Sequence, residues 1–128
     1  MTAFLSDEWF AEFAAMRAAA GDLEIAPKLA ALKLNLVVSD TAQGDVDVCL
    51  NGGILTPGHD AGAVATMTMP ADLARRILLK WDQAAGMSGM LARKIKVEGD
   101  KMKLMAMQST RLSPQHKALL AQIDDRTA

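Results

Sequence analysis

The sequence predicts an α+β fold in which one antiparallel or mixed sheet has its helices gathered on one face. Apolar residues recur with a period of two in some segments and at helical spacing in others. The predicted strands lie at 32–40, 45–51, 53–56, 63–69 and 93–98, and the predicted helices at 6–20, 70–81 and 113–123. No repeat, linker or low-complexity tract separates them, which predicts a single domain over residues 1–128, long enough to bury a core.

The first predicted helix, residues 6–20, has a start signal and an amphipathic pattern. Ser6 is a favourable N-cap, and the acidic Asp7 and Glu8 suit the positive end of the helix dipole. Gly21 can close the C-terminal end. The apolar face consists of Trp9, Phe13, Met16 and Ala20.

The next segments predict an antiparallel hairpin followed by further strands. The stretches "LKLNLVVSD" (32–40) and "DVDVCLN" (45–51) each place apolar residues on one face, and a short loop at Gly44 joins them. A shorter extended piece at 53–56 precedes the loop "PGHDAG". The stretch "AVATMTM" then places Met67 and Met69 on the face opposite the neighbouring threonines.

The chain then returns to helical spacing. Pro70 suits a first helical turn and opens a predicted helix, which Gly86 and Gly89 are expected to break. The apolar stripe of this helix consists of Leu73, Ile77, Leu78 and Trp81.

A strand and a helix complete the predicted elements. The strand "RKIKVE" directs Ile95 and Val97 inward. Ser113 is the expected N-cap of the last helix, and Pro114 occupies its first helical position. Leu119, Leu120 and Ile123 form its buried side.

The pattern after Asp100 leaves two alternatives open. A helix can start at Lys101, although lysines in a first helical turn are disfavoured by the dipole. Alternatively, "EGDK" is a hairpin turn and "MKLMAM" is a second strand.

Composition excludes several classes of partner and location. The 14 basic and 15 acidic residues leave a net charge of −1, which cannot hold nucleic acid by charge alone. Cys49 is the only cysteine, so an internal disulfide is impossible and a reducing compartment, the cytoplasm, is expected. We expect no signal peptide and no membrane-spanning segment, because no apolar run is long enough.

The sequence offers no catalytic, metal or cofactor motif, so we expect a protein that is not an enzyme. Neither histidine has metal-like spacing, and the glycines form no phosphate-binding loop. His59 is interpreted as a solvated turn residue, and His116 as a residue that covers the edge of a helix interface. Catalysis would be reconsidered only if Cys49, His59 and an acidic residue converged in space.

Basic residues and methionines gather in the C-terminal third. A solvated strand face explains the cations most simply, whereas contact with anionic lipid headgroups is the sharper alternative. The nine methionines supply soft, adaptable surfaces that suit either a core or a ligand site. The basic residues are Arg93, Lys94, Lys96, Lys101, Lys103 and Arg111.

Two stretches carry a resemblance to a known family. The run "LARKIKVEGDKMKLM" (91–105) resembles the C-terminal signature of the sterol carrier protein 2 family, a glycine-led strand ending in Gly-Asp and followed by a helix rich in Leu and Met. Upstream, "ATMTMPADLARRIL" is similar to the strand-to-helix step of that family. Arg93 stands where the family customarily has glycine, and Met90 where it has phenylalanine.

The resemblance implies a five-stranded mixed or antiparallel sheet, covered on one face by helices and enclosing an apolar tunnel. It favours the helix after Asp100. It also implies non-catalytic binding, and transfer, of fatty acyl chains, sterol-like molecules or other apolar ligands. The residues carried over as lining the tunnel are Met67, Met69, Ile77, Trp81, Met87, Met90, Ile95, Val97, Met102 and Met105.

The alternative hypothesis is an accessory or scaffold module of the same fold. Such a module would act through protein–protein contacts, for example in lipid or quinone metabolism or as a homodimer. Its cavity would be filled by its own side chains.

Overall fold

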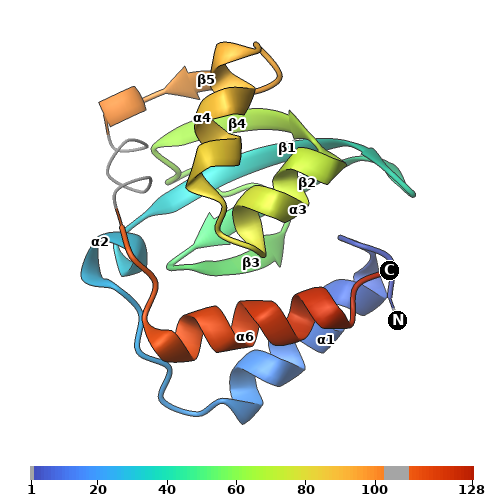
Figure 1. The fold of residues 1–128 in the computed structure, drawn as a ribbon, viewed down its shortest axis with the longest axis vertical. Coiled ribbons are helices and arrows are strands. Elements are labelled where there is room, and N and C mark those ends of the chain that lie inside the picture. The colour runs from blue at the N-terminus through green and yellow to red at the C-terminus, as the bar shows by residue number, and fades with distance from the viewer. Residues whose placement is uncertain (1, 103–109) are drawn as a thin grey trace.

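Five strands form one mixed sheet at the centre of the molecule (Figure 1). The structure is a computed structural model in which residues 2–102 and 110–128 are described. The strand order is β3-β2-β1-β4-β5, so the chain crosses from one edge of the sheet to the other side of β1 between β3 and β4. The strands are β1 (Lys33–Thr41), β2 (Gly44–Asn51), β3 (Ile54–Pro57), β4 (Ala65–Pro70) and β5 (Lys96–Gly99).

The helices pack in two groups. Helix α3 packs on β1, β4 and α4, whereas α1 packs on α6 and β3. In Figure 1, α4 and β5 lie at the end of the molecule opposite α1 and α6. The bounds are α1 (Asp7–Ala19), α2 (Pro27–Ala30), α3 (Ala71–Leu78), α4 (Gln83–Leu91) and α6 (Pro114–Asp125).

The register of the sheet confirms the predicted hairpin and defines one apolar face. Leu36 pairs with Val48 of antiparallel β2 and with Met67 of parallel β4, and Met67 in turn pairs with Val97 of β5. Paired residues point to the same face of a sheet. These side chains therefore lie in one layer, and most of them belong to the hydrophobic core.

The first helix begins as predicted and is tied to the end of the chain. The Ser6 hydroxyl accepts a hydrogen bond from the Trp9 backbone N–H at 3.2 Å. The Trp9 ring is fully buried, and its Nε1 donates to the Thr127 hydroxyl at 2.8 Å. This hydrogen bond gives the buried indole N–H a partner, and it links α1 to the segment after α6.

The prediction between residues 70 and 98 is wrong in two places. The first helix there ends at Leu78, and Trp81 follows it with a positive φ of 50° and not as part of the helical stripe. Gly86 and Gly89 do not break a helix, since both lie inside α4. The Asp82 carboxylate starts α4 by accepting a hydrogen bond from Ala85 N at 3.0 Å.

The predicted strand 93–98 begins later, at Lys96, because α4 ends in a Schellman motif. Arg93 adopts a positive φ of 60° and donates its N–H to the carbonyl of Met90 at 3.1 Å. The Lys94 N–H reaches the carbonyl of Gly89 at 2.8 Å. This pair of bonds defines the motif, whose left-handed position favours glycine. Arg93 is therefore the residue that bears the backbone strain.

Replacing Arg93 by glycine is expected to stabilise the protein by about 1 kcal/mol, because glycine has no Cβ to oppose a positive φ. Urea unfolding of both proteins measures the difference. Ala92→Gly is the matched control, since Ala92 has an ordinary φ of −80°. That substitution should instead cost about 0.5–1 kcal/mol. An Arg93→Gly protein no more stable than Ala92→Gly would contradict the argument.

Candidate functional site

The residues predicted to line a tunnel lie on β4, α3, α4 and β5 and on the segments that flank them. They run from the buried layer of the sheet to the surface. Met67, Met69, Ile77 and Ile95 are buried, Trp81 and Val97 are partly buried, Met87, Met90 and Met102 are exposed, and Met105 lies outside the described residues.

Helix α4 packs against the buried side chains of Leu73 and Ile95 at Gly89. A Cβ added there would lie 2.7 Å from Leu73 Cδ2 and 2.8 Å from Ile95 Cδ1. Both distances are shorter than ordinary van der Waals contact, so no larger residue fits without movement of its neighbours. Because Gly89 has no side chain, the backbone of α4 can pack directly against Leu73 and Ile95.

A cavity of about 250 Å³ opens between α3 and α4. Leu73, Ala85 and Gly89 provide apolar surface, and the polar groups include Ser88 and Lys94. The remaining lining residues are Arg76, Ala84 and Ala92. The cavity is slightly smaller than the range of about 300–1,000 Å³ that holds drug-sized ligands. It offers room for a short stretch of an apolar chain.

Helix α4, which lines this cavity, also carries exposed apolar side chains. In the described part of the chain, those that are exposed are Met87 (62%), Met90 (42%), Leu91 (83%) and Met102 (81%). The first three belong to α4, and Met102 follows β5 by three residues. Residues 101 and 102 are helical, and the Asp100 carboxylate accepts a hydrogen bond from Met102 N at 3.1 Å. The predicted continuation of that helix lies outside the described residues.

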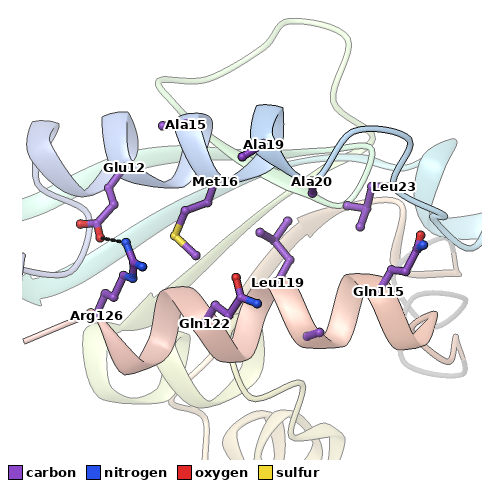
Figure 2. Close-up of a pocket in the computed structure, with 11 residues that line it drawn as sticks. Glu12, Ala15, Met16, Ala19, Ala20, Leu23, Gln115, Leu119, Gln122 and Arg126 are labelled. Carbon is purple, nitrogen blue, oxygen red and sulfur yellow. Dashed lines mark hydrogen bonds and ion pairs between the residues drawn. The ribbon is translucent and has the colours of Figure 1, made fainter.

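A larger groove, of about 660 Å³, runs between α1 and α6 (Figure 2). Four of its eleven lining residues are alanines, and Met16, Leu23 and Leu119 add larger apolar side chains. An ion pair between Glu12 and Arg126, at 3.4 Å, lies at one end. None of the predicted site residues that the structure describes lines this groove. Its lining comprises Glu12, Ala15, Met16, Ala19, Ala20, Leu23, Gln115, Ala118, Leu119, Gln122 and Arg126.

His59 lies exposed in the loop between β3 and β4, as predicted for a solvated turn residue, but its ring also has partners. Its Nε2 lies 2.8 Å from the Leu36 carbonyl and 3.7 Å from the Asp47 carboxylate. Asp60 beside it exchanges two hydrogen bonds with the Asn35 side chain, through its backbone N–H and carbonyl. Since Asn35 points to the face opposite Leu36, this loop crosses the face of the sheet that the apolar layer does not occupy.

Cys49 lies buried on the same face as Asn35, its partner in the register. Burial, and then the negative charge of Asp60, raise the pKa of the Cys49 thiol above its usual value. A protonated thiol is a poor nucleophile. The interactions described for His59 lead to Leu36 and Asp47, and none of them joins His59 to Cys49.

His116 is placed differently from the prediction, since it is fully buried and not at the edge of an interface. Its Nε2 lies 2.9 Å from the Gly53 carbonyl, so the N–H must sit on Nε2 and donate. Among the described residues, Nδ1 has no hydrogen-bond partner. Burial, reinforced by the positive charge of Arg17 and opposed by the bond to Gly53, lowers the pKa of His116.

Within residues 2–102 and 110–128, no three histidine, cysteine or acidic side chains converge in a way that could hold a metal ion. The helices described in those ranges are too short or too polar to cross a bilayer.

Comparison with known proteins identifies the fold. No family model matches the chain, and no curated protein sequence matches it significantly. Among solved structures, sterol carrier protein 2 like 2 from Aedes aegypti aligns with 18% identity over 81% of this chain and 94% of its own, with a TM-score of 0.54. Sterol carrier protein 2 from Yarrowia lipolytica, in its apo form, aligns with 16% identity over 94% and 98%, at 0.51.

A palmitated form of the Aedes aegypti protein aligns with 20% identity over 85% of this chain and 99% of that one, at a TM-score of 0.50. Identities this low establish the fold alone. The α+β fold predicted from the sequence, with a five-stranded mixed sheet and helices packed on it, is confirmed as that of sterol carrier protein 2.

Proposed function

We propose that the protein binds the apolar chains of lipids, such as fatty acyl or sterol-like molecules, without catalysis. The observation that carries this proposal is the exposure of Met87 and Met90 on α4, the helix whose Gly89 packs against the buried Leu73 and Ile95. Each methylene removed from water against such a surface contributes about 0.8 kcal/mol. The shared fold with sterol carrier proteins, one of them solved in palmitated form, supports the same function.

The ligand in this proposal lies along α4, with part of its chain in the cavity beneath that helix. Methionine side chains are flexible and polarizable, so Met87 and Met90 can adapt to chains of different shape. The ten residues expected from the resemblance then have two tasks. The buried members, such as Met67 and Ile95, form the apolar surface beneath the ligand, while the exposed members cover the ligand.

A specific observation favours the alternative of an accessory module. Met67, Met69, Ile77 and Ile95 each have almost no surface that water could touch. Side chains around an open tunnel would retain such surface, so these four fill the space between sheet and helices in the absence of a ligand. The accessory module needs no ligand, whereas a ligand longer than the cavity between α3 and α4 requires α4 to shift away from Leu73 and Ile95. Transfer of lipids, a cytoplasmic location and a homodimer stay predictions.

Lipid binding is tested by displacement of a fluorescent fatty acid from the purified protein, together with native mass spectrometry for lipids that co-purify. Met87→Glu is expected to weaken fatty-acid binding at least about tenfold, because it places a charge against the chain. Met87 is exposed, so the protein should fold normally.

Ala19→Glu is the matched control, since it introduces the same charge at an exposed position of the α1–α6 groove. Loss of binding in Ala19→Glu alone would move the site to that groove. No displacement and no co-purified lipid in the unaltered protein would contradict lipid binding and favour the accessory module.

A further inference from the structure

The cavity between α3 and α4 is apolar in its depth and charged at its mouth. Its buried lining residues are Leu73, Ala85 and Gly89, none of which has a charged side chain. Two of its exposed lining residues, Arg76 and Lys94, are cations. We propose that this cavity binds an apolar chain of up to about eight carbons that ends in a carboxylate, with the carboxylate held at the two cations. This inference rests on the proposed function, because it names the end group and the chain length that one part of that site accepts.

The size of the cavity limits the length of the chain that it can hold. A methylene group occupies about the volume of a water molecule in the liquid, roughly 30 Å³, so a cavity of about 250 Å³ holds about eight such groups. The inner side is closely packed at Gly89, where even a Cβ would lie 2.7 Å from Leu73 Cδ2 and 2.8 Å from Ile95 Cδ1. Further carbons must therefore stay outside the cavity. A sterol-like molecule is too large for it.

The backbone holds Lys94 beside the cavity. Arg93, with its positive φ of 60°, turns the chain back at the end of α4. The Lys94 N–H then donates to the carbonyl of Gly89 at 2.8 Å, so the start of the Lys94 side chain is fixed against a residue of the same cavity. Within residues 2–102 and 110–128 the Lys94 ammonium has no ion-pair partner. Its charge is therefore available to a ligand.

The charges at the mouth match a carboxylate. Arg76 Nη2 donates to the Asp82 carboxylate at 3.1 Å, while the other oxygen of that carboxylate accepts from Ala85 N at 3.0 Å. The remaining N–H groups of the guanidinium, and the Ser88 hydroxyl in the cavity wall, can donate to a ligand. Arg76 and Lys94 bring two positive charges and Asp82 one negative charge, which leaves +1. One carboxylate balances this charge, whereas a phosphate monoester, with nearly two negative charges, exceeds it.

A nuclear magnetic resonance titration of the intact protein tests the proposal, because the amide signals of residues 84–94 report on this cavity. The probes are hexanoate, octanoate, decanoate and dodecanoate, together with octanol and octyl phosphate. Affinity should rise about fourfold per methylene up to octanoate, and less than about twofold per methylene beyond it. Octanoate should bind about threefold to fivefold more tightly than octanol, and at least as tightly as octyl phosphate.

The variant Lys94→Gln removes the charge without removing the backbone contact of Lys94, whose side chain is exposed. It should weaken octanoate binding about threefold to fivefold, to the affinity of octanol. Lys117→Gln is the matched control, since Lys117 is exposed on α6, which contributes none of the described lining residues. This control should bind octanoate as the unaltered protein does.

Equal affinities for octanoate and octanol would overturn the proposal, and so would tighter binding of octyl phosphate or equal losses in Lys94→Gln and Lys117→Gln. A gain of about fourfold per methylene that continues to dodecanoate would overturn the chain-length limit and leave the proposed function intact. Displacement of the fluorescent fatty acid without binding of any of the short acids would contradict this inference alone. Absence of both would contradict the proposed function as well.

Discussion

Gly99→Ala is expected to destabilise the protein by about 3 kcal/mol, because two independent effects oppose a side chain at this position. Gly99 has a φ of 113°, a conformation that residues with a Cβ rarely adopt. The resulting strain costs about 1–3 kcal/mol. An added Cβ would also lie 2.7 Å from the Val64 carbonyl oxygen and 2.8 Å from Ala65 Cα. These are backbone atoms beside and within β4, so they cannot rotate away, and overpacking adds about 1–3 kcal/mol.

Gly58→Ala separates the two effects. Gly58 has a comparable φ of 85°, but no atom lies within 4 Å of the position that its Cβ would take. Urea unfolding should therefore show a loss of about 1–2 kcal/mol for Gly58→Ala, from backbone strain alone. Gly99→Ala should lose at least about 1 kcal/mol more. Equal losses would mean that β4 and β5 separate easily at this point.

The same glycine shows which parts of the structure the sequence could predict. Gly99 belongs to the "VEGD" stretch that carried the resemblance, and its backbone explains why that stretch needs glycine: β5 ends against β4 with no room for a Cβ. Local signals of this kind were sufficient elsewhere as well. The N-cap at Ser6 and the period-two stretches of β1 and β2 act within a few residues, and the structure confirms each of them.

Features that depend on distant contacts could not be predicted in this way. His59 is held by the Leu36 carbonyl, and His116 by the Gly53 carbonyl, 63 residues away in the chain. Nothing near either histidine indicates these partners. The α1–α6 groove likewise forms only when two helices far apart in the sequence pack together. The small side chains of Ala15, Ala19, Ala20 and Ala118 were a signal that space could remain between these helices.

Two errors had a local signal that was overlooked. Asp82 precedes Ala85 at the spacing of an N-cap, which could have predicted α4 despite its glycines. Pro27 at a first helical position could likewise have predicted α2. The exposure of Met87, Met90 and Met102 had no such signal, because periodicity shows which residues share a face but not whether another element covers it.

His116 is expected to make the stability of the protein depend on pH, because it is buried in its neutral form. Burial lowers the pKa of His116 in the folded state below the ordinary 6.5. The unfolded chain therefore binds a proton between these two pKa values while the folded protein does not. The contribution to stability is complete above about pH 6.5 and is lost as pH falls from there toward the folded pKa, with a slope of at most about 1.4 kcal/mol per pH unit.

Urea unfolding at several values between about pH 7.5 and about pH 5 measures this slope against His116→Gln. The glutamine amide can still donate to the Gly53 carbonyl, but it cannot be protonated, so its stability should vary less over this range. The variant should be less stable by about 1–3 kcal/mol at the upper limit, where the packing of the imidazole is lost. The difference should shrink as pH falls.

Asp60 and Asp82, whose carboxyl pKa values are lowered by hydrogen bonds from Gly62 N and Ala85 N, lose their contributions only at more acidic pH. Parallel curves for the two proteins would contradict the argument, because they would mean that the folded and unfolded states bind the His116 proton equally.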